Sequence, residues 1–195
     1  MRSFIAVVLI ASIVISAPSA AQHAGAAASL TVSAPKEVSQ LDFLVGDWDL
    51  DVAVPATTLA AKIHGMPKLV GTWRVRKALD GWGLEDDMKI TDVAGNPKSM
   101  SHNVRYFDRN TRRWAISGLD VYRGKFSTST GEWRGSEMHL SGSGKDANGN
   151  TQMIRTRIYD IRQAGFKFKQ EKSDDRGKTW KENISIEARR TRGST

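Results

Sequence analysis

Two side chains that could act together as an acid and a base stand on either side of a predicted turn. Asp86 belongs to an apolar run that ends near Ile90, and His102 follows the turn around Gly95. If the two strands pair about Gly95, Met88 faces His102, and Asp86 lies diagonal to His102 on one apolar face. Burial and mutual charge shift the pKa values of such a pair, so it could orient a ligand or transfer a proton. The simpler interpretation is a satisfied internal pair that fixes strand register, since a slip of one residue would turn these side chains outward.

A second set of candidate residues is aromatic. Five large rings fall on faces that alternation predicts to point inward, namely Trp48, Trp73, Trp82, Tyr106 and Trp114. In a small barrel such rings mostly fill the core, but they can also line a cavity for an apolar or aromatic ligand. These five, with Asp86 and His102, are therefore the candidate ligand-binding residues.

Other catalytic and metal-binding patterns are missing from the sequence. His23, His64, and Glu137 with His139 do not have the spacing of a metal-ligand set. No serine stands in a Gly-x-Ser-x-Gly context that would activate it as a nucleophile. The sequence predicts no metal site and no cofactor, and it favours a binding protein over an enzyme.

The N-terminus has the three parts of a secretory signal. Arg2 precedes the apolar stretch from Phe4 to Ile15, and small residues follow up to Ala21. The apolar stretch is too short to span a bilayer stably, so we expect no stable membrane insertion. The sequence predicts a signal peptide over residues 1–21, cleaved near Ala21, and a flexible lead-in over 22–40. The mature protein is then periplasmic or secreted.

Composition limits what the exported part can be. The chain has 195 residues, no cysteine and a formal net charge of +8. After the lead-in about 150 residues remain, which suits one domain that is stabilised by its core rather than by disulfides. Basic residues are interspersed with acidic ones instead of alternating with aromatics, so we expect no nucleic-acid partner. We expect a monomer or a homodimer.

Strict alternation begins at Gly46. From Trp48 to Val54 every second residue is apolar and aspartates occupy the other positions, which is typical of a strand with one face buried. The segment from Leu69 to Val75 alternates in the same way. Its neighbours Arg74 and Arg76 face outward, where they would pair across strands with the aspartates of the first strand.

Helical spacing is confined to two short segments. Pro35 to Leu44 places apolar residues at helical intervals and predicts a short helix that plugs one end of the sheet. Pro55 to Pro67 is irregular and forms the longest loop, with one helical turn around Thr58 to Ile63.

Further strand-like runs follow at short, regular spacing up to Ala188, separated by turns rich in Gly, Asn, Asp and Ser. Nine or ten strands without intervening helices predict an antiparallel, all-β barrel or sandwich. A closed meander barrel is favoured because closure removes exposed edges. We expect this domain over residues 41–190, followed by a basic tail over 191–195.

Several short motifs occur along the chain in the same order as in one known family. They are Phe43–Trp48, Gly71–Trp73, Leu84–Asp86, Tyr106–Asp108 before Trp114, and Ile186–Arg190. From Leu41 to Arg190 the chain thereby resembles small bacterial lipocalin-like barrels related to the calycins and nitrobindins. The resemblance implies a closed barrel. Haem-binding nitrobindins would need a histidine near the C-terminus, and this chain has none after His139.

The segment from Ser173 to Trp180 resembles the Asp-box of sialidases. It matches at Ser173, Asp175, Gly177, Thr179 and Trp180. The resemblance implies a hairpin turn in which the aspartate binds turn amides, the glycine permits the backbone and the tryptophan packs beneath. A propeller glycosidase would need several copies and a longer chain, so we expect a structural turn.

Three functions are compatible with these patterns. The leading hypothesis is an exported barrel that binds a small hydrophobic or amphipathic molecule in its lumen, beneath the Pro55–Pro67 loop. The catalytic alternative is a hydrolase or isomerase that uses Asp86 and His102. The third is a structural, envelope-associated interaction protein, which would show an exposed apolar patch and no cavity.

Overall fold

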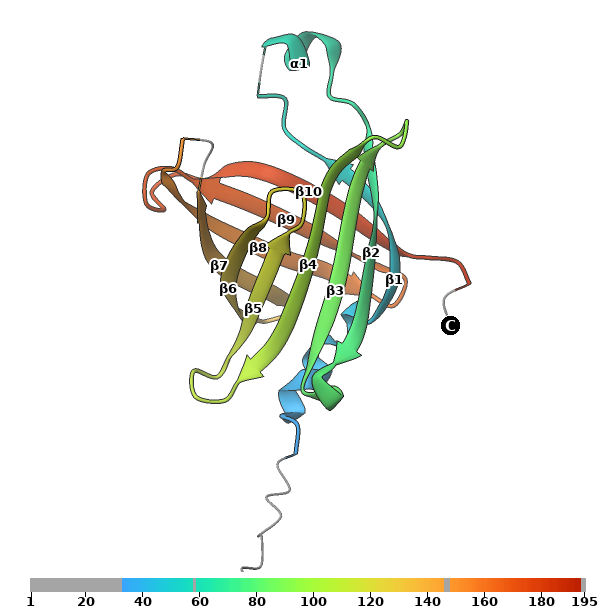
Figure 1. Cartoon of the computed structure of the whole chain (residues 1–195), viewed down its shortest axis with the longest axis vertical. Coiled ribbons are helices and arrows are strands. Elements are labelled where there is room, and N and C mark those ends of the chain that lie inside the picture. The colour runs from blue at the N-terminus through green and yellow to red at the C-terminus, as the bar shows by residue number, and fades with distance from the viewer. Residues whose placement is uncertain (1–32, 58, 146–147, 194–195) are drawn as a thin grey trace, which may run out of the picture. The chain divides into compact units, whose positions relative to one another are not determined.

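Ten antiparallel strands close into one barrel in the computed structural model, which describes residues 33–57, 59–145 and 148–193 (Figure 1). The strands follow one another around the barrel in chain order, and the last pairs with the first. They are β1 (Gly46–Ala53), β2 (Leu69–Ala78), β3 (Gly83–Asp92), β4 (Pro97–Asp108), β5 (Arg113–Asp120), β6 (Lys125–Arg134), β7 (Glu137–Lys145), β8 (Thr151–Arg162), β9 (Gly165–Ser173) and β10 (Lys181–Arg190). The predicted closed meander barrel is confirmed.

Alternation decides which face of each strand points inward. In β1 the buried residues are Trp48, Leu50 and Val52, and the aspartates between them face outward. Asp47 accepts a hydrogen bond from Arg76 at 2.7 Å and lies 3.3 Å from Nε of Arg74. The predicted outward pairs between the first two strands are therefore confirmed.

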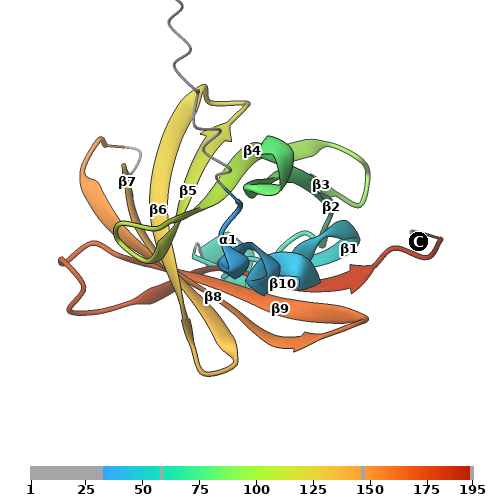
Figure 2. The same cartoon turned by 90° about the horizontal axis from the view of Figure 1, so that it is seen from below.

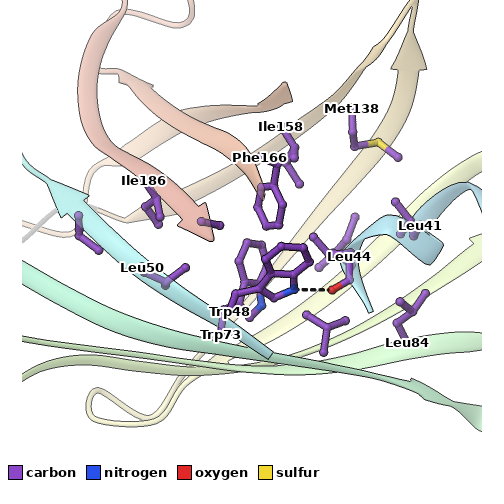
Figure 3. Packing of buried hydrophobic residues seen from close by; sticks show 14 of the residues in the cluster. Leu41, Leu44, Trp48, Leu50, Trp73, Leu84, Met138, Ile158, Phe166 and Ile186 are labelled. Carbon is purple, nitrogen blue, oxygen red and sulfur yellow. Dashed lines mark hydrogen bonds between the residues drawn. The ribbon is translucent and has the colours of Figure 1, made fainter. Parts of the chain in front are cut away.

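A short helix closes one end of the barrel. The 3-10 helix η1 (Lys36–Leu44) buries Val38, Leu41 and Leu44, as the helical spacing predicted. Seen from this end, the helix lies across the barrel beside β1 and β10 (Figure 2). The carbonyl of Leu44 accepts a hydrogen bond of 2.7 Å from the indole of Trp48 (Figure 3). We call this the closed end.

Aromatic rings fill the closed end. Phe166 of β9 makes edge contacts with Trp48 and Trp73, at centroid distances of 4.8 Å and 5.6 Å (Figure 3). A third edge contact joins Phe166 to Phe43 at 5.8 Å. Edge-to-face pairs of this kind add to the stabilisation that burial already provides. The barrel is therefore a packed core at this end.

Arg190, at the end of β10, fastens the last strand to the helix and to the first strand. Its guanidinium lies 4.2 Å from the centre of the Trp48 ring and donates to the carbonyl of Val45 at 3.2 Å. A side chain at Gly46 would overlap this guanidinium, and φ of Gly46 is +137°. The glycine at which alternation begins is needed for this close approach.

The loops at the other end surround an opening, which we call the mouth. Because neighbouring strands alternate in direction, the long β1–β2 connection and the β3–β4, β5–β6, β7–β8 and β9–β10 turns all lie there (Figure 1). The β1–β2 connection contains α1 (Leu59–His64), which confirms the predicted helical turn. At the closed end, the 3-10 turn η2 (Leu79–Gly81) joins β2 to β3.

The β9–β10 turn has the hydrogen bonds expected from its sequence. Asp175 accepts from the Thr179 amide at 2.8 Å, the Thr179 hydroxyl at 2.6 Å and the Ser173 hydroxyl at 2.7 Å. Gly177 has φ of +88°, and its carbonyl accepts from the indole of Trp180 at 3.0 Å. The segment is a hairpin turn that its own side chains hold together.

The predicted signal peptide, and the lead-in up to residue 32, lie outside the described residues. Within the part of the chain that is described, no helix is long and apolar enough to cross a membrane.

Truncating Leu44 tests the closed end. This side chain is fully buried, so Leu44→Ala should lower the free energy of unfolding by about 2–5 kcal/mol through lost contacts and a cavity. The control Leu79→Ala removes an exposed leucine at the same end and should cost less than about 0.5 kcal/mol. Urea denaturation measures both. Equal effects would show that η1 does not pack into the barrel.

Removing the Thr179 hydroxyl tests the β9–β10 turn. Hydrogen bonds, first those from Thr179 and then that from Ser173, hold the pKa of Asp175 well below its ordinary 3.8. Ionised Asp175 therefore stabilises the fold above pH 3.8, and this contribution is lost as pH falls through the lowered pKa. In Thr179→Val the pKa of Asp175 should rise towards 3.8.

An NMR titration of the carboxyl groups measures this shift. Asp92 serves as an internal control, because Asn96 holds its pKa at about 2 in a different turn. An unchanged Asp175, or an equal shift of Asp92, would contradict the assignment.

Candidate functional site: a cavity at the mouth

A cavity of about 430 Å³ occupies the half of the barrel nearer the mouth. Its lining mixes apolar and polar side chains. The apolar side chains come from strands all around the barrel and include Met88, Ile90, Ile116, Leu140, Phe168 and Ile184. Most of the hydroxyl groups come from β4, β6 and β7 and include those of Ser99, Ser101, Ser129, Ser141 and Ser143, while Thr156, Gln170 and Asn183 add polar groups on β8, β9 and β10. The interior can therefore hold a molecule that carries both apolar and polar groups.

A hydrogen-bonded network forms the floor of the cavity, where it meets the core. Asp86 is 1 % exposed and accepts hydrogen bonds from three side chains. Its Oδ1 accepts from the Trp73 indole at 2.8 Å and from the Asn103 amide at 2.8 Å, and its Oδ2 accepts from Nε of Arg105 at 2.6 Å. Charge-assisted bonds of this length are the strong ones in proteins, so the four side chains hold each other in place.

Strand register explains how this network assembles. Asp86 of β3 is paired with Asn103 of β4, and Asn103 is paired with Gly118 of β5. A Cβ at Gly118 would lie 2.5 Å from the side-chain oxygen of Asn103. The glycine therefore makes room for the amide that reaches Asp86.

The predicted pairing of Asp86 with His102 is wrong. The register places Asp87 opposite His102, one residue away from the expected alignment, and His102 lies on the outer face. Its Nδ1 is 2.9 Å from the Asp87 carboxylate, and both side chains are about half exposed. Asp86 points inward and His102 outward, so the structure does not bring them together.

A β-bulge causes the shift. Ile90 pairs with Ser99, but the next residue, Thr91, pairs with Pro97, so β4 has one extra residue at this point. Such a bulge moves every later residue of the strand to the opposite face from that expected without it. The inner face of β4 therefore carries Ser101, Asn103 and Arg105.

The five candidate aromatic residues are divided between different environments. Trp73 lines the cavity, whereas Trp48 and Trp114 are buried in the core. The Trp114 indole donates to the Gln40 side chain at 3.1 Å. These two rings pack the closed end and do not border the cavity.

Tyr106 and Trp82 lie away from the lumen. Tyr106 was predicted to face inward, but it is 44 % exposed, because it follows the bulge on β4. Trp82 was also predicted on the inner face. It lies half-buried in the turn before β3, with the Arg109 guanidinium 5.0 Å from its ring centre. Neither ring borders the cavity.

Sequence reasoning missed Asn103, Arg105 and the serines that line the cavity. Polar residues at every second position of β4 look like an outward face when the core is assumed to be apolar. The turn before β4 offered a signal for the register. Asp92 binds the amides of Ala94 and Asn96, and the β-bulge that shifts the register of β4 follows this turn.

Most of the large apolar side chains that are solvent-exposed in the described residues lie around the mouth, on its loops or at the adjoining ends of its strands. They are Leu59, Ile63, Met66, Val93, Val121, Tyr122, Phe126 and Met153, with Phe126 83 % exposed. No group of three His, Cys, Asp or Glu that could hold a metal ion is found anywhere in the described part of the chain.

Comparisons with known proteins support the fold and no more. No protein-family model and no curated protein matches the sequence. Among solved structures, the crystal structure of Rv2717c from M. tuberculosis is similar, with a TM-score of 0.57 and 12 % sequence identity. The match covers 82 % of this chain and 100 % of that chain. At this identity the likeness extends to the barrel architecture alone, and the closer resemblance to lipocalin-like families stays a prediction.

Truncating Asp86 and His102 separately tests their different placements. Asp86→Ala leaves Arg105 buried without its carboxylate and should lower the free energy of unfolding by about 3–5 kcal/mol. His102→Ala removes one partner of an exposed pair and should cost less than about 1 kcal/mol. Urea denaturation compares the two. Similar losses would mean that His102 shares the buried environment of Asp86.

Proposed function

We propose that the protein is an exported barrel that binds a small amphipathic molecule in its lumen. The observation that carries this proposal is the cavity of about 430 Å³, which is lined by both apolar side chains and hydroxyl groups. Ligand pockets commonly have volumes of about 300–1,000 Å³ and combine apolar surface with a few polar groups. A barrel that only needed a stable core would gain by filling this space.

The ends of the barrel support the same proposal. The closed end is packed with aromatic rings and η1, while the opposite end leads into the cavity. Exposed apolar side chains on the loops of the mouth, such as Ile63 and Val121, offer a surface to an apolar ligand as it enters. Entry from the mouth is therefore part of the proposal.

Export is supported by the signal-like N-terminus. We propose a periplasmic or secreted location for the mature chain. Cell fractionation, with N-terminal sequencing of the mature protein, tests this location and the cleavage near Ala21.

The two alternatives have less support. An Asp86/His102 hydrolase or isomerase loses its acid–base pair, because the two side chains lie on opposite faces of the barrel wall. An interaction protein without a ligand would need no cavity, and a cavity is present. The absence of a nucleic-acid partner and the monomeric or homodimeric state stay predictions.

Filling the cavity with a side chain tests the proposed function. Ser129 lines the cavity from β6, so the ring of Ser129→Phe should occupy the space of a bound probe. We expect this variant to bind phenylnaphthylamine, a fluorescent uncharged lipophile, about tenfold or more weakly, equivalent to about 1.4 kcal/mol.

The matched control is Thr130→Phe, which places the same ring at the adjacent, exposed position of the same strand. Fluorescence titration of this variant should give the affinity of the unmodified protein. The proposed function fails if the probe does not bind, or if both variants weaken it equally.

A further inference from the structure

Arg105 is the cation of the inner cavity. The charged residues among those that line the cavity are Arg105 and Asp120. Asp120 lies at the mouth, and its carboxylate accepts a hydrogen bond of 2.7 Å from Arg123 in the same turn. Deeper in the barrel, Arg105 is 6 % exposed and sits on the floor.

One side of the Arg105 guanidinium is bound and the other is not. Nε donates to Asp86, whereas neither Nη nitrogen has a hydrogen-bond partner among the described residues. The described side-chain atoms that are sealed in protein without a partner are Nε of Arg113 and Nε1 of Trp133. The Nη nitrogens of Arg105 therefore border the cavity instead of being enclosed by protein.

Asp86 holds the guanidinium in place without occupying its free end. Its two oxygens already accept from Trp73, Asn103 and Arg105, so it is a positioning residue. The ring of Trp73, 5.7 Å from the guanidinium carbon, further limits its movement. A fixed, planar pair of Nη groups matches the two oxygens of an acidic group, which it can bind through two parallel hydrogen bonds.

We infer that the lumen selects an organic anion, whose acidic group binds the Nη nitrogens of Arg105 and whose apolar body lies against Met88, Ile90 and Phe168. This inference rests on the proposed function and specifies its ligand class. The hydroxyl groups that line the cavity accommodate further polar groups of the same ligand. A neutral lipophile fits the same space but leaves the buried Nη groups without a partner, which costs affinity.

A matched pair of fluorescent probes tests the inference. Anilinonaphthalene sulfonate and phenylnaphthylamine share one ring skeleton and differ by the sulfonate. The unmodified protein should bind the sulfonate about tenfold or more tightly, as expected of a charge-assisted hydrogen bond. Arg105→Gln should abolish this preference.

A double variant keeps the test independent of folding defects. Asp86→Asn with Arg105→Gln removes both charges of the buried pair, so that neither is left uncompensated, and should also lose the preference. Arg74→Gln, on the outer face, should leave the preference unchanged and controls for binding to surface charge.

The outcomes separate the two proposals. If phenylnaphthylamine binds but the sulfonate binds no more tightly, or if Arg105→Gln keeps the preference, the anion inference fails and the proposed function stands. If Arg74→Gln lowers the preference as much as Arg105→Gln, the sulfonate binds outside the lumen and the inference fails. If neither probe binds, both proposals fail.

Discussion

Packing of large rings against the short N-terminal helix is the constraint from which the rest of this barrel follows. Trp48 and Trp73 surround Phe166, and the Trp48 indole is tied to the end of the helix by one hydrogen bond. These rings fill the interior at the closed end. Towards the mouth the inner face carries several serines, whose side chains are too small to fill the remaining space. The asymmetry between a solid half and a hollow half is therefore a direct result of side-chain size.

The buried ion pair stands at the boundary between the two halves. Placing a carboxylate and a guanidinium there is unfavourable unless hydrogen bonds replace the lost water. Asp86 meets this condition, with donors from Trp73, Asn103 and Arg105. Arg105 meets it in part, which is unusual for a side chain so deeply buried. A group that stabilised the fold alone would be expected to have all its donors satisfied by the protein.

The sequence was sufficient to predict strands whose inner face is apolar. Trp48, Trp73 and Leu84 each lie where period-two alternation placed them, since burial of such residues dominates the choice of face. The same reasoning failed for β4, whose inner face borders a cavity and carries Asn103 and Arg105. Val104 and Tyr106 of that strand lie on its outer face, and the bulge opposite Thr91 follows a turn whose hydrogen bonds hydrophobicity does not report.

Closure by the two end strands has a consequence for when the lumen exists. Pairing of β1 with β10 joins the beginning of the domain to its end, and Arg190 completes that seam over Trp48. Contacts between such distant segments form late, because the whole intervening chain must first be brought together. A growing chain thus has no enclosed space until its final strand has docked. The interior is completed only when the last residues of the domain are in place.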